Sequence, residues 1–169
     1  MTIDTEPFGV ALLVGLGATA VLDLWAITLK FTVGIAPTNW CIVGRWFCHM
    51  PSGRFVHTSI AGAESRPHEC AVGWAAHYAI GGVYGLALVV LMSGAWLARP
   101  SVLPALLFGL ATMVFPFFVM QPCFGMGVAS SNTPNPTVAR LKTLMSHSIF
   151  GIGLYLCAVA VQFTRAGMH

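Results

Sequence analysis

The sequence predicts an all-α integral membrane protein: a four-helix bundle crossing the bilayer, in a single domain over residues 1–169. Two features of the composition support this prediction, a hydrophobic share of 57% and a charged share of only 8%. Soluble domains carry about 25% charged residues, so the composition excludes an ordinary soluble enzyme. The third observation is four apolar runs, each close to the ~20 residues that a helix needs to cross a bilayer.

Basic residues and prolines mark where the spans end. Lys30 closes the first span, Arg99 follows the second, Pro122 stops the third and Arg165 closes the fourth. Acidic residues precede the first apolar run, where a signal peptide needs positive charge, so we expect this span to be retained. The spans are expected at residues 8–31, 71–97, 103–120 and 141–163.

The long first connection contains an amphipathic segment. Large apolar side chains recur there at three- and four-residue spacing, as on one face of a helix. Its tryptophans suggest a short helix in the membrane interface, and Thr38 or Asn39 is expected to cap it. The apolar face consists of Trp40, Val43, Trp46, Phe47 and Met50.

The uneven distribution of basic residues predicts an orientation. Loops one and three, with the adjacent helix ends, carry six Lys or Arg residues, whereas the remainder of the chain carries Arg99 and Arg165. Cytoplasmic loops are enriched in Lys and Arg, so we expect loops one and three to face the cytoplasm from a bacterial inner membrane. The six residues are Lys30, Arg45, Arg54, Arg66, Arg140 and Lys142.

The chain has the features of a duplicated helical hairpin. Segments 8–97 and 103–163 each contain a span with an Ala-Thr pair, a Pro/Asn turn, an arginine and a second span with a histidine. In this comparison His77 corresponds to His147. Each copy crosses the membrane twice, which predicts a parallel repeat. Chance similarity is the alternative, because apolar helices share small residues.

Three ionisable side chains are predicted to lie in the same half of the bilayer. At 1.5 Å per residue, Asp23 lies about 16 Å from the loop-one end of its span, and His77 and His147 lie about 10 Å from the matching ends. Each shares a helix face with a small or hydroxyl residue four positions away, so it should face another helix. The candidate solute- or ion-binding residues are Asp23, Thr19, Asn39, Arg45, His57, His77, Gln121, Asn135, Arg140 and His147.

Structural roles are the alternative for the same residues. Asp23 costs roughly 2.5–3.5 kcal/mol in a span, so it needs a partner, which a structural ion pair would also supply. The histidines could bond backbone across helices, the asparagines could cap helices, and the arginines could lie among lipid headgroups.

A metal centre is a further interpretation. His77, His147 and Asp23 have the chemistry of metal ligands, and the two histidines that of haem ligands. Five cysteines without a CxxC pair predict neither a zinc finger nor a disulfide framework. Softer side chains in and beside loops one and three suit copper(I), namely Cys48, Met50, Met120, Cys123 and Met126.

Six motifs along the chain resemble those of one bacterial family. They are Gly17-Ala18-Thr19 to Asp23-Leu24-Trp25, Asn39-Trp40 to Val43-Gly44-Arg45-Trp46, Gly53-Arg54-Phe55 with His57, Gly73-Trp74-Ala75-Ala76-His77-Tyr78, Pro116-Phe117-Phe118 to Met120-Gln121-Pro122, and Thr133-Pro134-Asn135-Pro136 to Arg140. On these motifs the chain is similar, over nearly its whole length, to the uncharacterised inner-membrane proteins called domain of unknown function 2938. This resemblance implies a small polytopic membrane protein and no particular activity, and it does not extend to Cys41, Cys48, Cys123 or Met126.

Three functions agree with these features. The first is a carrier or permease for a small solute, proton or metal ion, expected as a homodimer because four helices form a thin pathway. The second is a membrane-embedded metal or haem protein, including an enzyme. The third is a non-catalytic subunit of a larger membrane complex. The chain has no nucleophilic triad, phosphate loop or HExxH motif, and no Lys/Arg cluster for nucleic acid, so the lipid bilayer is the expected environment and partner.

Overall fold

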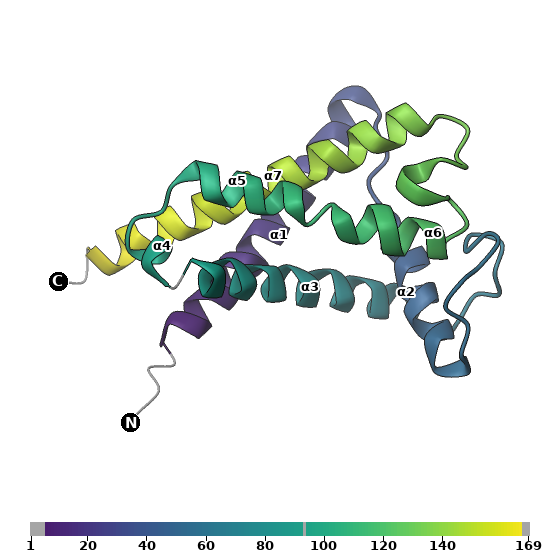
Figure 1. Cartoon of the computed structure of the whole chain (residues 1–169), viewed down its shortest axis with the longest axis horizontal. Helices are drawn as coiled ribbons and strands as arrows, with labels where there is room; N and C mark the ends of the chain where they lie inside the picture. The colour runs from purple at the N-terminus through teal and green to yellow at the C-terminus, as the bar shows by residue number, and fades with distance from the viewer. Residues whose placement is uncertain (1–5, 93, 167–169) are drawn as a thin grey trace.

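The computed structural model describes residues 6–92 and 94–166, and every regular element within them is helical. Four helical segments are long and apolar enough to cross a membrane, as predicted. The start of α1 (Glu6–Val33) and the end of α7 (Pro136–Ala166) lie at one end of the bundle, and α2 (Trp40–His49) lies at the other (Figure 1). The candidate spans are Phe8–Val33, Glu69–Leu91, Val102–Cys123 and Pro136–Arg165.

Glycine and proline explain two differences from the predicted boundaries. α3 (Glu69–Leu91) ends earlier than expected and α4 (Ala95–Ala98) follows, because Gly94 adopts a left-handed conformation with φ of 72°. α7 starts earlier than expected, with Pro136 as its first residue. Proline suits that position because its missing N–H would have no partner inside the helix.

The third span is interrupted, which the sequence analysis did not predict. Pro116 cannot donate a backbone hydrogen bond, and the bonding pattern changes there to a π-helical turn. The N–H of Gln121 bonds to the carbonyl of Pro116, five residues earlier. The span consists of α5 (Val102–Ala111), η2 (Pro116–Met120), α6 (Gln121–Cys123) and the residues between them.

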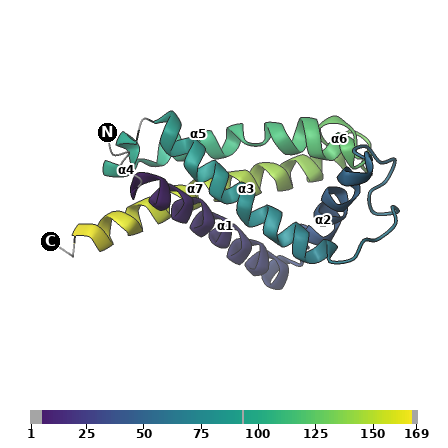
Figure 2. The same cartoon turned by 90° about the horizontal axis from the view of Figure 1, so that it is seen from below.

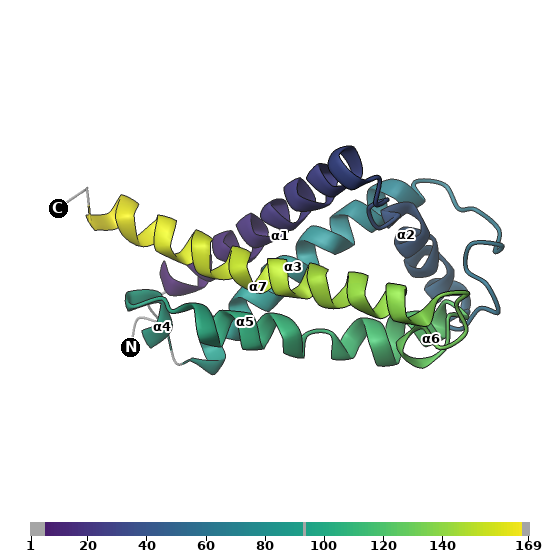
Figure 3. The same cartoon turned by 90° about the horizontal axis from the view of Figure 1, so that it is seen from above.

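The spans pack as a curved row. α1 packs against α3 and α7, and α5 packs against α7. Figure 3 shows α7 running between α1 and α5. The backbones of α3 and α5 are not among the closely packed pairs of the described residues, but the rings of Tyr84 and Phe108 meet across them, with centroids 6.2 Å apart. The parallel repeat stays a prediction.

Glycines allow α1 and α3 to approach closely. A Cβ atom at Gly15 would collide with the carbonyl of Gly81, and one at Gly85 would collide with the backbone of Ala11 and Gly15. Small residues at such crossings are typical of membrane helices, because they bring two backbones into van der Waals contact.

This contact predicts that a valine destabilises the protein much more at one glycine of α1, Gly15, than at another, Gly9. We expect Gly15→Val to lower the midpoint of thermal unfolding in detergent by about 5–10 °C, because overpacking a close contact costs about 1–3 kcal/mol or more. Gly9→Val is the matched control, since nothing lies within 4 Å of a Cβ built at Gly9. Equal midpoints for the two variants would contradict the crossing.

The amphipathic helix is confirmed at α2, but its environment differs from the prediction. Figure 2 shows α2 lying across the end of α3. Trp46 is buried, with 4% of its surface exposed, and packs with Val43, Ile60 and Phe124 in a cluster that we call the loop cluster. The inward face of α2 is therefore not available as a docking surface.

Candidate functional site

A cavity of about 120 Å³ lies between α1, α2, α3, η2 and α7. α3 contributes Ile80 and Gly81 to its lining, and the third span contributes Pro116 and Met120. Its lining is mainly apolar, but it includes two histidines that the sequence analysis placed at the same depth, His77 and His147. Its aromatic lining consists of Trp40, Trp46, Phe47, Tyr84, Phe115 and Phe150.

His77 is bonded to Asp23, which does not itself line the cavity. Nε2 of His77 lies 3.0 Å from Oδ1 of Asp23, and the hydroxyl of Tyr78 donates to Oδ2 at 2.9 Å. The ring of Trp40 stacks on the ring of His77, with centroids 3.7 Å apart. Asp23 thus has the polar partners that a carboxylate in an apolar span requires.

These contacts determine the proton arrangement of neutral His77. A carboxylate only accepts hydrogen bonds, so Nε2 of His77 carries a hydrogen and donates it to Asp23. Nδ1 then keeps its lone pair. In the described part of the chain Nδ1 has no hydrogen-bond partner.

In neutral His147, too, one ring nitrogen donates a hydrogen bond and the other keeps its lone pair, but the partners differ from those of His77. The hydroxyl of Thr112 donates to the carbonyl of Gly109 at 2.6 Å, and Nδ1 of His147 lies 2.8 Å from that hydroxyl. Since the hydroxyl hydrogen is already used, Nδ1 of His147 is the donor and Nε2 keeps its lone pair. When both imidazoles are neutral, each therefore has one nitrogen lone pair without a partner among the described residues, and both histidines line the same cavity.

Few other polar groups reach the cavity. The hydroxyl of Thr19 donates to the carbonyl of Gly15 at 2.9 Å, as is common in membrane helices. Ser146 also lines the cavity, and its hydroxyl has no partner within residues 6–92 and 94–166. Gln121 is buried outside the lining, with Nε2 3.4 Å from the hydroxyl of Thr143 and Oε1 unpaired in the described residues.

Besides Asp23 and Gln121, five predicted binding residues are not part of the cavity lining. Asn39 caps α2 by accepting from the N–H of Cys41 at 3.1 Å, as the sequence predicted. Arg140 donates to the carbonyl of Ala129 at 2.8 Å. The contact of Asn39 agrees with its predicted capping role, whereas the backbone contact of Arg140 was not predicted. The five residues are Asn39, Arg45, His57, Asn135 and Arg140.

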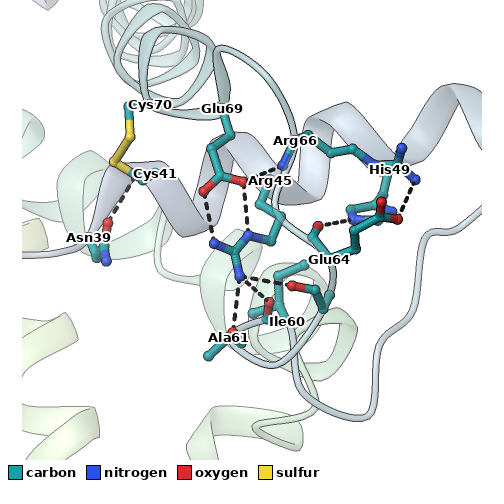
Figure 4. Close-up of polar contacts among 11 residues, drawn as sticks. Asn39, Cys41, Arg45, His49, Ile60, Ala61, Glu64, Arg66, Glu69 and Cys70 are labelled. Atoms are coloured by element: carbon teal, nitrogen blue, oxygen red, sulfur yellow. Dashed lines mark hydrogen bonds and ion pairs between the residues drawn. A yellow bond between two sulfur atoms is a disulfide. The ribbon is translucent and has the colours of Figure 1, made fainter.

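Arg45 holds the first loop against the bundle (Figure 4). Its Nε and Nη2 atoms donate to the two carboxylate oxygens of Glu69 at 2.9 and 2.8 Å. Its Nη1 atom donates to the carbonyls of Ala61 and Ala63, both at 3.0 Å. Hydrogen bonding to Glu69 raises the pKa of Arg45, which keeps the guanidinium charged.

A disulfide corrects the prediction drawn from the cysteines. Cys41, near the start of α2, is bonded to Cys70, near the start of α3. The two residues are 29 positions apart in the sequence, and only the crossing of α2 with α3 brings them together. Cys48, Cys123 and Cys157 are free and half-buried.

Four of the five sulfur-containing residues proposed to bind copper pack against the same cluster, and the fifth does not. Met50, Met120, Cys123 and Met126 pack against the loop cluster, whereas Cys48 is not among its neighbours. The described residues contain no group of three or more His, Cys, Asp and Glu side chains placed to hold a metal ion. The metal site at His77, His147 and Asp23, the copper site and the binding of haem therefore stay predictions.

A comparison with known families gives one match. Residues 12–161 match the family described as Protein of unknown function (DUF2938). The chain belongs to this family. No curated protein and no solved structure matches the chain.

Several residues that build the site in this DUF2938 protein were missed by the sequence analysis. Tyr78 and Thr112 complete the contacts of the two histidines, and Ser146 adds a hydroxyl to the cavity. Tyr78 directly follows His77, and Thr112 corresponds to Thr19 in the proposed repeat, so each had a signal in the sequence. Glu69 had no such signal, because 24 residues separate it from Arg45.

The environment of His57 predicts an acid-sensitive first loop. Both ring nitrogens are buried without a partner among the described residues. Burial, followed by the nearby His49 and Arg54, lowers the pKa of His57 from its ordinary value of 6.5. The unfolded loop therefore binds a proton more readily, and protonation below about pH 6.5 favours unfolding.

We expect a lower thermal midpoint at about pH 5.5 than at about pH 7.5. His57→Phe should reduce this difference, because it removes the group whose proton affinity changes on unfolding. His68→Asn serves as the control, since asparagine tolerates the left-handed backbone of His68. An unchanged pH dependence in His57→Phe would contradict the assignment.

Proposed function

We propose that the protein is a membrane carrier that binds a small monocarboxylic acid with an apolar body, together with one proton. One observation carries the proposal: His77 and His147, each with an available lone pair, line a single apolar cavity. A proton-donating group can bond to such a lone pair. The mainly apolar lining suits a hydrocarbon body and disfavours a hydrated ion.

The cavity volume limits the size of the ligand. An apolar cavity of about 150 Å³ accommodates benzene, so about 120 Å³ suits a ligand close to one ring or a short alkyl chain in size. A haem is much larger than this. Benzoate and short-chain fatty acids fall in the expected range.

The polar groups match the two oxygens of a carboxylic acid. In the neutral form, the acid donates its O–H to a lone pair of His77 or His147, and its carbonyl accepts from the hydroxyl of Ser146. In the equivalent ionic form, an imidazolium donates to the carboxylate, and Asp23 stabilises a cationic His77. Either form contains one acid anion and one proton.

A carrier explains why the proton matters. Near neutral pH a carboxylic acid is almost entirely ionised, and its anion crosses hydrocarbon poorly. Binding the anion with a proton removes the net charge before the membrane is crossed. The proton gradient would then set the direction of net movement.

Calorimetric binding of benzoate to the purified protein in lipid nanodiscs tests the proposal. We expect about one proton taken up per benzoate near pH 7, from the dependence of the binding enthalpy on the buffer. His77→Gln and His147→Gln should each weaken binding at least about tenfold, equivalent to about 1.4 kcal/mol. His68→Asn, a histidine outside the cavity, should bind as the wild type does.

Transport is measured by benzoate counterflow in proteoliposomes, with protein-free liposomes as the baseline for passive diffusion. Exchange above this baseline that is lost in His77→Gln supports the carrier. Absence of benzoate binding, or equal affinity in the cavity and control variants, would remove the proposal. Binding without exchange would reduce the protein to a receptor for the acid.

A further inference from the structure

The Cys41–Cys70 disulfide lies at the end of the bundle that carries loops one and three. It joins the first turn of α2 to the first turn of α3. Figure 4 shows it on the other side of Glu69 from the loop carbonyls that Arg45 binds. The bond therefore belongs to the folded contact between α2 and α3 and is not attached to an isolated loop.

The chemistry of this bond indicates a compartment. Disulfides persist in the oxidising environments outside the cytoplasm. In the cytoplasm, glutathione and thioredoxin keep thiols reduced. We infer that the end of the bundle with α2 and loops one and three faces the oxidising exterior of the inner membrane. The start of α1 and the end of α7 then face the cytoplasm, which is opposite to the orientation predicted from charge.

Three of the six basic residues that supported the opposite orientation make polar contacts within the folded protein. Arg45 binds Glu69 and two loop carbonyls, and Arg140 binds the carbonyl of Ala129. Arg66 lies 3.4 Å from a carboxylate oxygen of Glu64. The rule that Lys and Arg are enriched in cytoplasmic loops takes no account of such contacts. Because Arg45 and Arg140 each bind backbone carbonyls of the folded loops, the presence of these two residues on this side does not require a cytoplasmic location.

The oxidation step requires an exported partner. The thiols of Cys41 and Cys70 lose two protons and two electrons as the S–S bond forms. A thiol–disulfide oxidant of the exterior accepts the electrons, and its own disulfide becomes a dithiol. Exchange of this kind occurs through a mixed disulfide, so one of the two thiols must be accessible before α2 docks on α3.

The orientation also says which wall of the cavity lies toward the exterior. Trp40 precedes Cys41, lines the cavity and stacks on His77. The helix that covers the cavity is thus the one that the disulfide fixes to α3. If the proposed acid binding holds, the α2 wall of the site is the wall that faces the outside of the cell.

Differential thiol labelling tests the state of the bond. Membranes are dissolved in SDS with N-ethylmaleimide to block free thiols, and the protein is then reduced and treated with maleimide-polyethylene glycol. We expect two polymer chains on the wild-type protein, one for each cysteine of the bond. Cys41→Ser should gain none, because Cys70 is then blocked at the first step, and Cys48→Ser should still gain two.

Fusions at the C-terminus test the orientation without any ligand. We expect a green fluorescent protein fused there to fluoresce and an alkaline phosphatase fused there to be inactive. Both results are those of a cytoplasmic C-terminus. An active phosphatase at the C-terminus, or wild-type protein without polymer addition, would overturn the inference. Neither measurement depends on acid binding, so failure of the proposed function would leave both results unchanged.

Discussion

Replacing Glu69 with glutamine is expected to lower the free energy of unfolding by about 2–4 kcal/mol. The carboxylate accepts two hydrogen bonds from Arg45 and one from the N–H of Arg66. Only 12% of the Glu69 side chain and 15% of the Arg45 side chain are exposed. Loss of the negative charge leaves the guanidinium poorly solvated and without its counter-ion, which is the costly case for a buried pair.

Glu64→Gln provides the same chemical change in a different environment. Glu64 pairs with Arg66 at 3.4 Å, but 70% of its side chain is exposed. Exposed pairs contribute about 0–1 kcal/mol, so this variant should unfold almost as the wild type does. Unfolding by SDS titration in mixed micelles measures both free energies. Similar losses for the two variants would contradict the structural role of Arg45 and Glu69.

Asp23→Leu is expected to destabilise the protein by about 2–5 kcal/mol, because it leaves two donors in an apolar region without an acceptor. These donors are Nε2–H of His77 and the hydroxyl of Tyr78. Leucine branches at Cγ as aspartate does and is larger, so a cavity does not explain the loss. The same SDS titration measures it.

Asp23→Asn separates stability from function. The amide oxygen still accepts from His77, and the hydroxyl of Tyr78 can accept from the amide nitrogen, so stability should fall by less than about 1 kcal/mol. Asparagine carries no charge, so it stabilises a cationic His77 less well. We therefore expect weaker benzoate binding at low pH with the fold preserved. A variant that unfolds as readily as Asp23→Leu would argue that the charge itself holds the structure.

Features formed by residues close together in the sequence could be predicted, whereas contacts between residues far apart in the sequence could not. The spans, the short helix and its Asn39 cap follow from local patterns, and the structure contains them. The shared depth of His77 and His147 follows from helix rise and agrees with their common cavity. The partnership of Asp23 with His77 was one of several open choices, because depth does not determine which faces meet.

Other features depend on tertiary contacts that no local pattern contains. The disulfide and the Arg45–Glu69 pair both arise where α2 crosses α3. Trp46 was expected in the membrane interface, since tryptophan is common there, but the folded first loop covers it. Its indole N–H donates to the carbonyl of Phe55 at 2.7 Å, a partner that only the folded loop supplies.

The π-helical turn in the third span has a mechanical consequence. The contact between α1 and α3 is rigid because it depends on glycine backbones, and α2 is fixed to α3 by a covalent bond. The turn at Pro116 instead contains one residue more than an α-helical turn. Sliding this extra residue along the helix would rotate Phe115 relative to Met120 while the backbone stays hydrogen-bonded. Of the walls around the cavity, we therefore expect the third span to change shape at the lowest energetic cost.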